Sequence, residues 1–172
     1  MKKIILTAMI AIATLTGMKA QDLGFWVGGR TSLWSGDSKT SFTLAPEAGF
    51  EITPQLTIAA SLALETSHFD NSDFEDDYVG VILNPYMRYT FFKTGIVSGF
   101  VDGGLEVGLG DLDGLQIGFK PGIALSMSRR FTAVLHFGFV GYNDGEGIAG
   151  RSEGIGFDLS GYRSSVGIYY SF

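Results

Sequence analysis

The sequence contains no cysteine, so disulfide bonds cannot stabilise the fold and no cysteine is available for an N-terminal lipid anchor. Basic residues are also few, and the 172 residues carry a formal net charge of −6. Nucleic-acid binding requires a basic surface, which this composition does not supply. Long apolar runs are missing after the first 20 residues, so no transmembrane helix is expected there.

The first 20 residues have the organisation of a secretory signal peptide. They begin with two lysines, continue with an apolar run too short for a transmembrane helix, and end with Ala20. Met18 departs from the small residue expected at its position, and an uncleaved N-terminal anchor is the alternative. We expect cleavage after Ala20, which leaves residues 21–172 as one exported domain. Without its three lysines the mature chain has 12 − 3 = 9 basic and 18 acidic residues, a net charge of −9.

The rest of the chain alternates between apolar and polar residues in short stretches. In the clearest stretch Leu56, Ile58, Leu62 and Leu64 share one face of a strand, while polar and small residues occupy the other. A strand of about 12 residues, tilted near 45°, rises roughly 28 Å and can cross a bilayer. The pattern predicts eight strands, over residues 23–34, 41–52, 56–66, 78–92, 96–110, 115–127, 131–142 and 155–172.

The connections between these stretches alternate in length. Residues 53–55, 93–95 and 128–130 form tight turns, whereas 35–40, 67–77 and 143–154 are longer, and only 111–114 breaks the rule. This asymmetry is typical of outer-membrane barrels and places both termini at the tight-turn end. The fold expected is therefore all-β, an eight-stranded antiparallel up-and-down transmembrane β-barrel.

Three prolines lie at one height in alternate strands, at Pro46, Pro85 and Pro121. Because proline cannot donate a ladder hydrogen bond, we interpret each as a bulge or a local bend. The alternative is that each proline separates two shorter strands.

The C-terminal stretch alternates to a final phenylalanine through Val166, Ile168, Tyr170 and Phe172. Aromatic residues close to strand ends fit the interfacial girdles of membrane barrels, and we assign Tyr89, Phe91, Phe131 and Tyr169 to such a girdle. The alternative for the C-terminal stretch is a core strand of a soluble barrel.

Several segments resemble the small outer-membrane β-barrel domain proteins, which are OmpX-like in size and common in Bacteroidota. They are LAPEAGFEITPQLTIAASLAL, VILNPYMRYTFF, FVDGGLEVGLG, FKPGIALSMSRRFTAVLHFGFVGY and SSVGIYYSF. The resemblance implies an eight-stranded barrel in the outer membrane. It also implies that Val166, Ile168, Tyr170 and Phe172 form the signal read by the barrel-assembly machinery, a transient partner. No single activity is implied.

The polar faces of the predicted strands carry charges that would point into the barrel. An eight-stranded barrel is only wide enough for its own side chains, so charges inside it must pair. We expect a structural salt-bridge network, with a gated ion path as the alternative. The residues of this network are Arg30, Glu47, Glu51, Glu65, Arg88, Asp102, Glu106, Lys120 and His136.

These observations predict a monomeric integral outer-membrane protein with a structural or surface-interaction role, no open pore, no cofactor and no enzymatic activity. One alternative is a secreted lipocalin-like barrel that binds an apolar ligand. The other is a lipid-modifying enzyme, for which His136 and a loop histidine, His68, beside Ser67 and Asp70, are the candidates. The acidic loop 67–77 is expected to be solvated, with calcium binding as its alternative.

Overall fold

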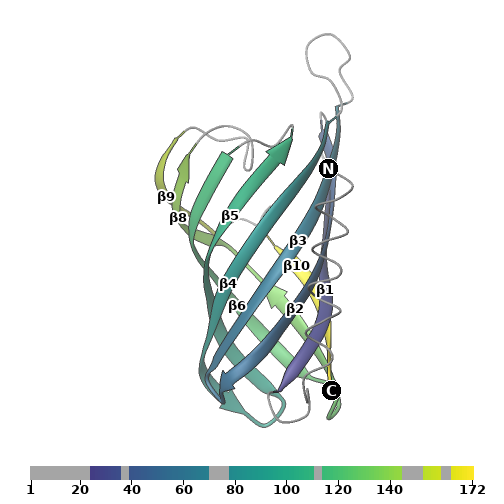
Figure 1. The fold of residues 1–172 in the computed structure, drawn as a ribbon, viewed down its shortest axis with the longest axis vertical. Helices are drawn as coiled ribbons and strands as arrows, with labels where there is room; N and C mark the ends of the chain where they lie inside the picture. The colour runs from purple at the N-terminus through teal and green to yellow at the C-terminus, as the bar shows by residue number, and fades with distance from the viewer. Residues whose placement is uncertain (1–23, 36–38, 70–77, 111–113, 145–152, 160–163) are drawn as a thin grey trace.

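The computed structural model describes residues 24–35, 39–69, 78–110, 114–144, 153–159 and 164–172. The expected leader, the acidic residues 70–77 and the centres of the other long connections lie outside these residues. The described chain forms a closed eight-stranded antiparallel β-barrel whose strands tilt strongly against the barrel axis (Figure 1). This confirms the predicted fold class.

Ten strand segments build the eight strands of the wall. The first six predicted strands are each a single segment, whereas the seventh and eighth are each divided in two, which the sequence pattern did not predict. The segments are β1 (Phe25–Ser35), β2 (Lys39–Thr53), β3 (Leu56–Phe69), β4 (Tyr78–Thr94), β5 (Val97–Gly110), β6 (Gly114–Ser126), β7 (Phe131–His136), β8 (Phe139–Asp144), β9 (Gly154–Asp158) and β10 (Ser165–Ser171).

The barrel closes where its first and last strands meet. β1 pairs with β10 from Trp26↔Ser171 to Thr31↔Val166. β5 pairs with β6 on the other side of the barrel. The amide of Phe172 also donates to the carbonyl of Phe25 at 3.1 Å. The start of β1 and the end of β10 therefore lie together, at the lower end of Figure 1.

Tight turns join the strands at this same end, as predicted. Pro54 and Gln55 connect β2 to β3, and Gly95 connects β4 to β5 with a φ of 59°. In the turn from β6 to β7, the hydroxyl of Ser128 accepts the amides of Arg130 at 3.2 Å and Phe131 at 3.0 Å. We call this the tight-turn end. At the opposite end the strands extend further than predicted: Ser67 and His68 belong to β3, and Asn143 and Asp144 belong to β8, rather than to loops.

The three prolines lie inside continuous strands, so they do not separate shorter strands. The register of β2 against β3 is the same before and after Pro46, and that of β4 against β5 is the same around Pro85. The predicted bulges are therefore absent at these two positions. Pro121 differs, because a one-residue register shift lies opposite it, between β7 and β8 at Gly138 with a φ of 77°.

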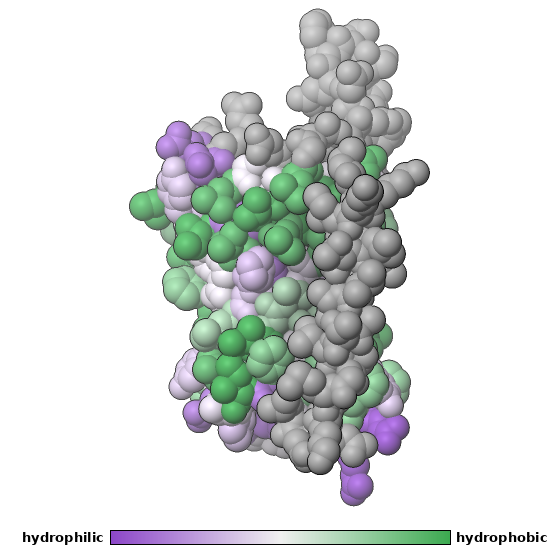
Figure 2. All heavy atoms as spheres, in the orientation of Figure 1, coloured by the Kyte–Doolittle hydropathy of each residue, from purple (hydrophilic) through white to green (hydrophobic). Residues whose placement is uncertain are grey.

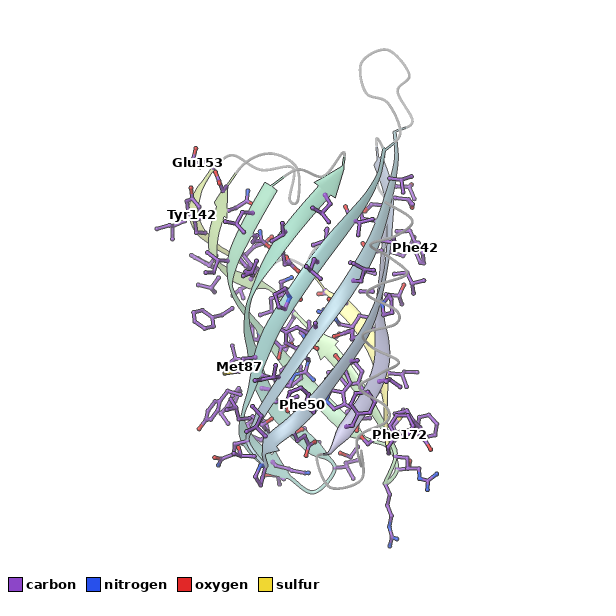
Figure 3. The ribbon with its side chains drawn as sticks, viewed as in Figure 1. Phe42, Phe50, Met87, Tyr142, Glu153 and Phe172 are labelled. Atoms are coloured by element: carbon purple, nitrogen blue, oxygen red, sulfur yellow. The ribbon has the colours of Figure 1, made fainter. Side chains whose placement is uncertain are left out.

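The two faces of the wall have opposite character. Large apolar side chains cover the outside, and Figure 2 shows them as extended hydrophobic areas on the face turned to the viewer. Phe42, Phe50 and Met87, which point away from the barrel in Figure 3, are 43%, 36% and 47% exposed. The inside holds aromatic and charged side chains instead. The predicted assignment of apolar residues to the outside is confirmed.

Four large rings fill the lower half of the barrel together with small residues. Trp26 stacks on Tyr169 with ring centroids 4.2 Å apart, and Tyr86 and Phe100 belong to the same buried cluster. Gly122 makes room for this packing, because a Cβ there would lie 2.3 Å from the ring of Phe100. These rings and the small residues beside them occupy this part of the lumen.

Candidate functional site

The barrel interior carries the only concentration of buried charges that the described residues form, and its centre is a bidentate ion pair. The guanidinium of Arg88 on β4 donates from Nε to Asp102 Oδ1 at 2.7 Å and from Nη2 to Oδ2 at 2.8 Å. These two residues are direct register partners on β4 and β5. His136 on β7 places Nε2 at 2.7 Å from Asp102 Oδ2, and all three side chains are buried. Such a forked geometry is among the strongest pairings that proteins make.

A second buried pair lies between β1 and β2. Arg30 donates from Nε to Glu47 Oε1, and its Nη2 donates to Ser61 Oγ at 3.3 Å. Glu47 also accepts the hydroxyl of Tyr86 at 2.5 Å. Both charged groups are almost excluded from solvent, so these hydrogen bonds replace the water that the charges lose.

Tyr169 connects the two pairs across the barrel. Its hydroxyl accepts a hydrogen bond from Arg88 Nη2 at 3.2 Å and donates to Glu47 Oε2 at 3.3 Å. The guanidinium of Arg88 also lies 3.9 Å from the ring centroid of Phe100, within cation–π range. Side chains from β1, β2, β4, β5, β7 and β10 therefore form one network, which we call the interior plug: Arg30, Glu47, Tyr86, Arg88, Phe100, Asp102, His136 and Tyr169.

Above the interior plug lies a separate pair with access to a small hollow. Lys120 Nζ on β6 donates to Glu106 Oε1 on β5 at 2.5 Å, and both side chains are partly buried. The hollow next to this pair is lined by Arg30, Asn84, Tyr86 and Gln116 among others, and its volume is about 10 Å³. This is room for roughly one water molecule. An organic ligand would not fit.

Two predicted members of the network lie elsewhere. Glu65 is on the inner face of β3 but is only half-buried, close to the end with the long connections. Glu51 is exposed at the tight-turn end, where its amide donates to the carbonyl of Gly24 at 3.3 Å. The prediction for Glu51 was therefore wrong. Its alternation was correct, but a residue this close to the end of its strand faces the barrel mouth rather than the interior.

Uncharged polar residues on the inward face of the strands also belong to the network, and the predicted network does not include them. Ser61 donates to Asn84 Oδ1 at 3.5 Å, and Asn84 donates from Nδ2 to the carbonyl of Leu105 at 2.9 Å. Both share the inward phase of Thr57 and Arg88 on their strands, which is the signal that identifies them. Charge alone had been used as the criterion, so uncharged partners were missed.

Tyr169 was assigned to the aromatic girdle, and this was wrong as well. Because side chains alternate along a strand, Tyr169 points inward while Ile168 and Tyr170 point outward. The outward C-terminal residues form a ladder at the tight-turn end. Phe172 stacks on Phe25 with centroids 5.6 Å apart and meets Tyr170 at 5.1 Å. Val166 and Ile168 continue the same outer face, both more than half exposed.

The charged groups of the interior plug are held in fixed ion pairs. The ring of His136 contacts Asp102 through Nε2 and lies 3.3 Å from Arg88 Nη2, and its Nδ1 has no hydrogen-bond partner. Within the residues that the structure describes, no group of three histidine or carboxylate side chains is arranged to hold a metal ion. The side chain of His68 and residues 70–77 lie outside that part of the chain.

No helix among the described residues has the length and hydropathy needed to cross a membrane. Comparison of the chain with protein-family models finds no match, and comparison with curated proteins finds none either.

Proposed function

We propose that the chain is an integral outer-membrane protein that crosses the bilayer as a monomeric closed barrel and acts structurally or through its surface. The observation that carries this proposal is the polarity of the wall. Exposed apolar side chains cover the outside, and buried ion pairs occupy the inside. A bilayer favours that arrangement, because lipid solvates the outer face and the pairing of β1 with β10 closes the wall.

The same polarity argues against a lipocalin-like barrel. A soluble barrel that binds an apolar ligand needs an apolar lumen and a polar outer surface. Here Arg30, Arg88 and Asp102 fill the lumen, while Leu64 and Ile58 are exposed on the outside. An apolar ligand would have to displace paired charges, and each charge left without its partner would cost several kcal/mol.

The heights of the side chains fit a membrane as well. Outward aromatic residues lie near the tight-turn end on both sides of the barrel: Tyr89 and Phe91 on β4, and Phe131 and Tyr170 on the adjacent strands β7 and β10. Rings at this position match the interface between hydrocarbon and headgroups. We propose that this end faces the periplasm, that export depends on the leader 1–20, and that the ladder ending at Phe172 is read by the assembly machinery.

The interior plug supports a role without transport. Its paired side chains reach across the lumen from several strands, and the hollow above it has room for roughly one water molecule. We therefore propose that function lies in the outer surface and in the long connections opposite the tight-turn end, and that the barrel itself is a rigid anchor without enzymatic activity.

The deciding experiment is refolding of the purified chain into phosphatidylcholine vesicles. A membrane barrel should stay with the vesicles in alkaline carbonate, require detergent for extraction, and migrate faster on gels before heating than after it. Recovery of folded protein in the aqueous fraction would overturn the proposal and favour the soluble barrel.

A matched pair of variants tests which face meets lipid. Leu64→Arg places a charge in the outer apolar band and should lower the free energy of unfolding in vesicles by about 2 kcal/mol. Thr66→Arg, on the same face of β3 but nearer its end, should cost less, because the penalty falls toward the interface. Equal and small effects would show that the outer face meets water.

A further inference from the structure

We infer that the tight-turn end carries a binding site for the phosphate of an anionic phospholipid, formed by Arg130 and Tyr170. This inference rests on the proposed membrane location. It begins from the distribution of basic residues. Arg30, Arg88 and Lys120 are each paired with a carboxylate inside the barrel. Among the residues whose side chains the structure describes, the exposed basic ones are Lys93, Arg129 and Arg130, and they lie at the tight-turn end.

Arg130 is held in place more firmly than an ordinary surface arginine. Its amide donates to Ser128 Oγ at 3.2 Å, and its carbonyl accepts the amide of Ser171 at 2.8 Å. The guanidinium donates from Nη1 to the hydroxyl of Tyr170 at 2.9 Å and lies 5.9 Å from the centroid of that ring. These contacts order the Arg130 side chain before any ligand binds, so that binding costs less conformational entropy.

The guanidinium keeps free donors for an anion. Arginine has five N–H groups in a fork that matches phosphate oxygens, and Tyr170 uses one of them. The Tyr170 hydroxyl accepts that bond and so retains its own proton to donate. Glu51, an exposed carboxylate at this end, lies on β2, which β1 separates from β10.

The position of Arg130 and Tyr170 along the barrel axis favours a lipid phosphate as the ligand. Phe131 meets Tyr170 at a centroid distance of 5.2 Å, and Phe172 meets it from the other side. These outward rings mark the interface where the headgroups of the adjacent leaflet lie. A phospholipid bound here would place its phosphate on Arg130 and its chains along the outer face of β10, where Ile168 and Val166 are exposed.

The test uses the full mature chain in a neutral detergent with equal amounts of dioleoyl phosphatidylglycerol and dioleoyl phosphatidylcholine. Native mass spectrometry then counts the lipids retained. The wild type should retain phosphatidylglycerol preferentially. Arg130→Gln should lower this preference about fivefold, the effect of one interfacial basic residue worth about 1 kcal/mol. Tyr170→Phe should lower it in the same direction, because the guanidinium loses its hydrogen bond.

Lys93→Gln is the matched control, since it removes one exposed positive charge near the end of β4, at the same end of the barrel as Arg130. It should change the preference by less than roughly twofold. Equal losses for Lys93→Gln and Arg130→Gln would show that general surface charge, rather than a site at Arg130, causes the lipid preference. Displacement of the lipid by an equal concentration of inorganic phosphate would show a site for free anions instead. A wild type without preference would also overturn the inference.

Failure of the membrane proposal is recognised separately. All variants are first refolded in phosphatidylcholine vesicles without anionic lipid, where insertion and the gel shift on heating depend on the barrel alone. If the wild type does not insert there, the membrane location and this site both fail. If every variant inserts and only the lipid preference is unchanged, the site fails and the membrane location stands.

Discussion

At the scale of single residues, the interior charges are satisfied by partners on neighbouring strands. Arg88 contacts Asp102 through two hydrogen bonds, Tyr169 through a third, and Phe100 through its ring face. Each bond compensates desolvation that would otherwise oppose folding. The stability of the plug therefore depends on keeping both partners of each pair.

Asp102→Ala should be strongly destabilising, because it leaves Arg88 buried without its carboxylate. We expect a loss of about 3–5 kcal/mol in the free energy of unfolding, measured by urea titration in vesicles with circular dichroism. Asp144→Ala, an exposed aspartate at the end of β8, is the control and should change little. Arg88→Met combined with Asp102→Leu should recover part of the loss. Similar values for the two single variants would contradict the role given to the pair.

At the scale of elements, the division of the seventh strand follows from one glycine. Gly138 has a φ of 77°, and the register against β6 shifts by one residue across it, from Gly122↔His136 to Phe119↔Val140. His136 and Phe139 therefore both point into the lumen, although they are three positions apart. In a regular strand, residues on the same face are two or four positions apart. The bulge allows both side chains to face the lumen.

Gly138→Ala should destabilise the barrel by about 1–2 kcal/mol, the cost of a Cβ in the left-handed region. The new Cβ would also lie 2.6 Å from the carbonyl oxygen of Asp158. Gly156→Ala on β9 is the matched control, since a Cβ there meets no atom within 4 Å. Urea titration of both variants provides the comparison. If Gly156→Ala costs as much as Gly138→Ala, backbone conformation is not the cause.

The strands predicted well from the sequence are those in which apolar and polar residues alternate regularly. In β3 every second residue from Leu56 to Leu64 is apolar, so the outward face of this strand followed from the pattern, whereas its last three residues did not. The bulge at Gly138 was missed because Phe137 and Phe139 flank it, and an aromatic ring suits either face of this wall. Tyr169 was misplaced for the same reason. Glu51 failed differently, because alternation fixes a face but not the depth at which a side chain lies.

At the scale of the whole molecule, the side chains of the interior plug meet across the lumen from several strands. The wild type in planar bilayers should show no reproducible large conductance steps, because paired side chains cross the lumen. A larger porin added to the same bilayers checks that channels can be detected. Stable, repeated steps from the pure chain would show that the plug opens, and would restore the gated ion path as the explanation of the buried charges.

Closure of the barrel was predictable because an exposed strand edge is costly and the number of alternating stretches was sufficient to avoid one. The network inside was predictable only in part. Alternation assigned Arg30, Glu47, Arg88 and Asp102 to one side of the wall. Which charge pairs with which depends on register and barrel stagger, and those are properties of the closed sheet rather than of any one strand.

The seam between β1 and β10 has a consequence for how the chain is made. Trp26 pairs with Ser171, so the edge of β1 that faces β10 finds its partner only when almost the last described residue is in place. The barrel thus cannot be completed strand by strand as it emerges. On the proposed outer-membrane route, the whole chain would cross the periplasm before closure, and its apolar outer face would be the surface that a periplasmic chaperone has to shield from water.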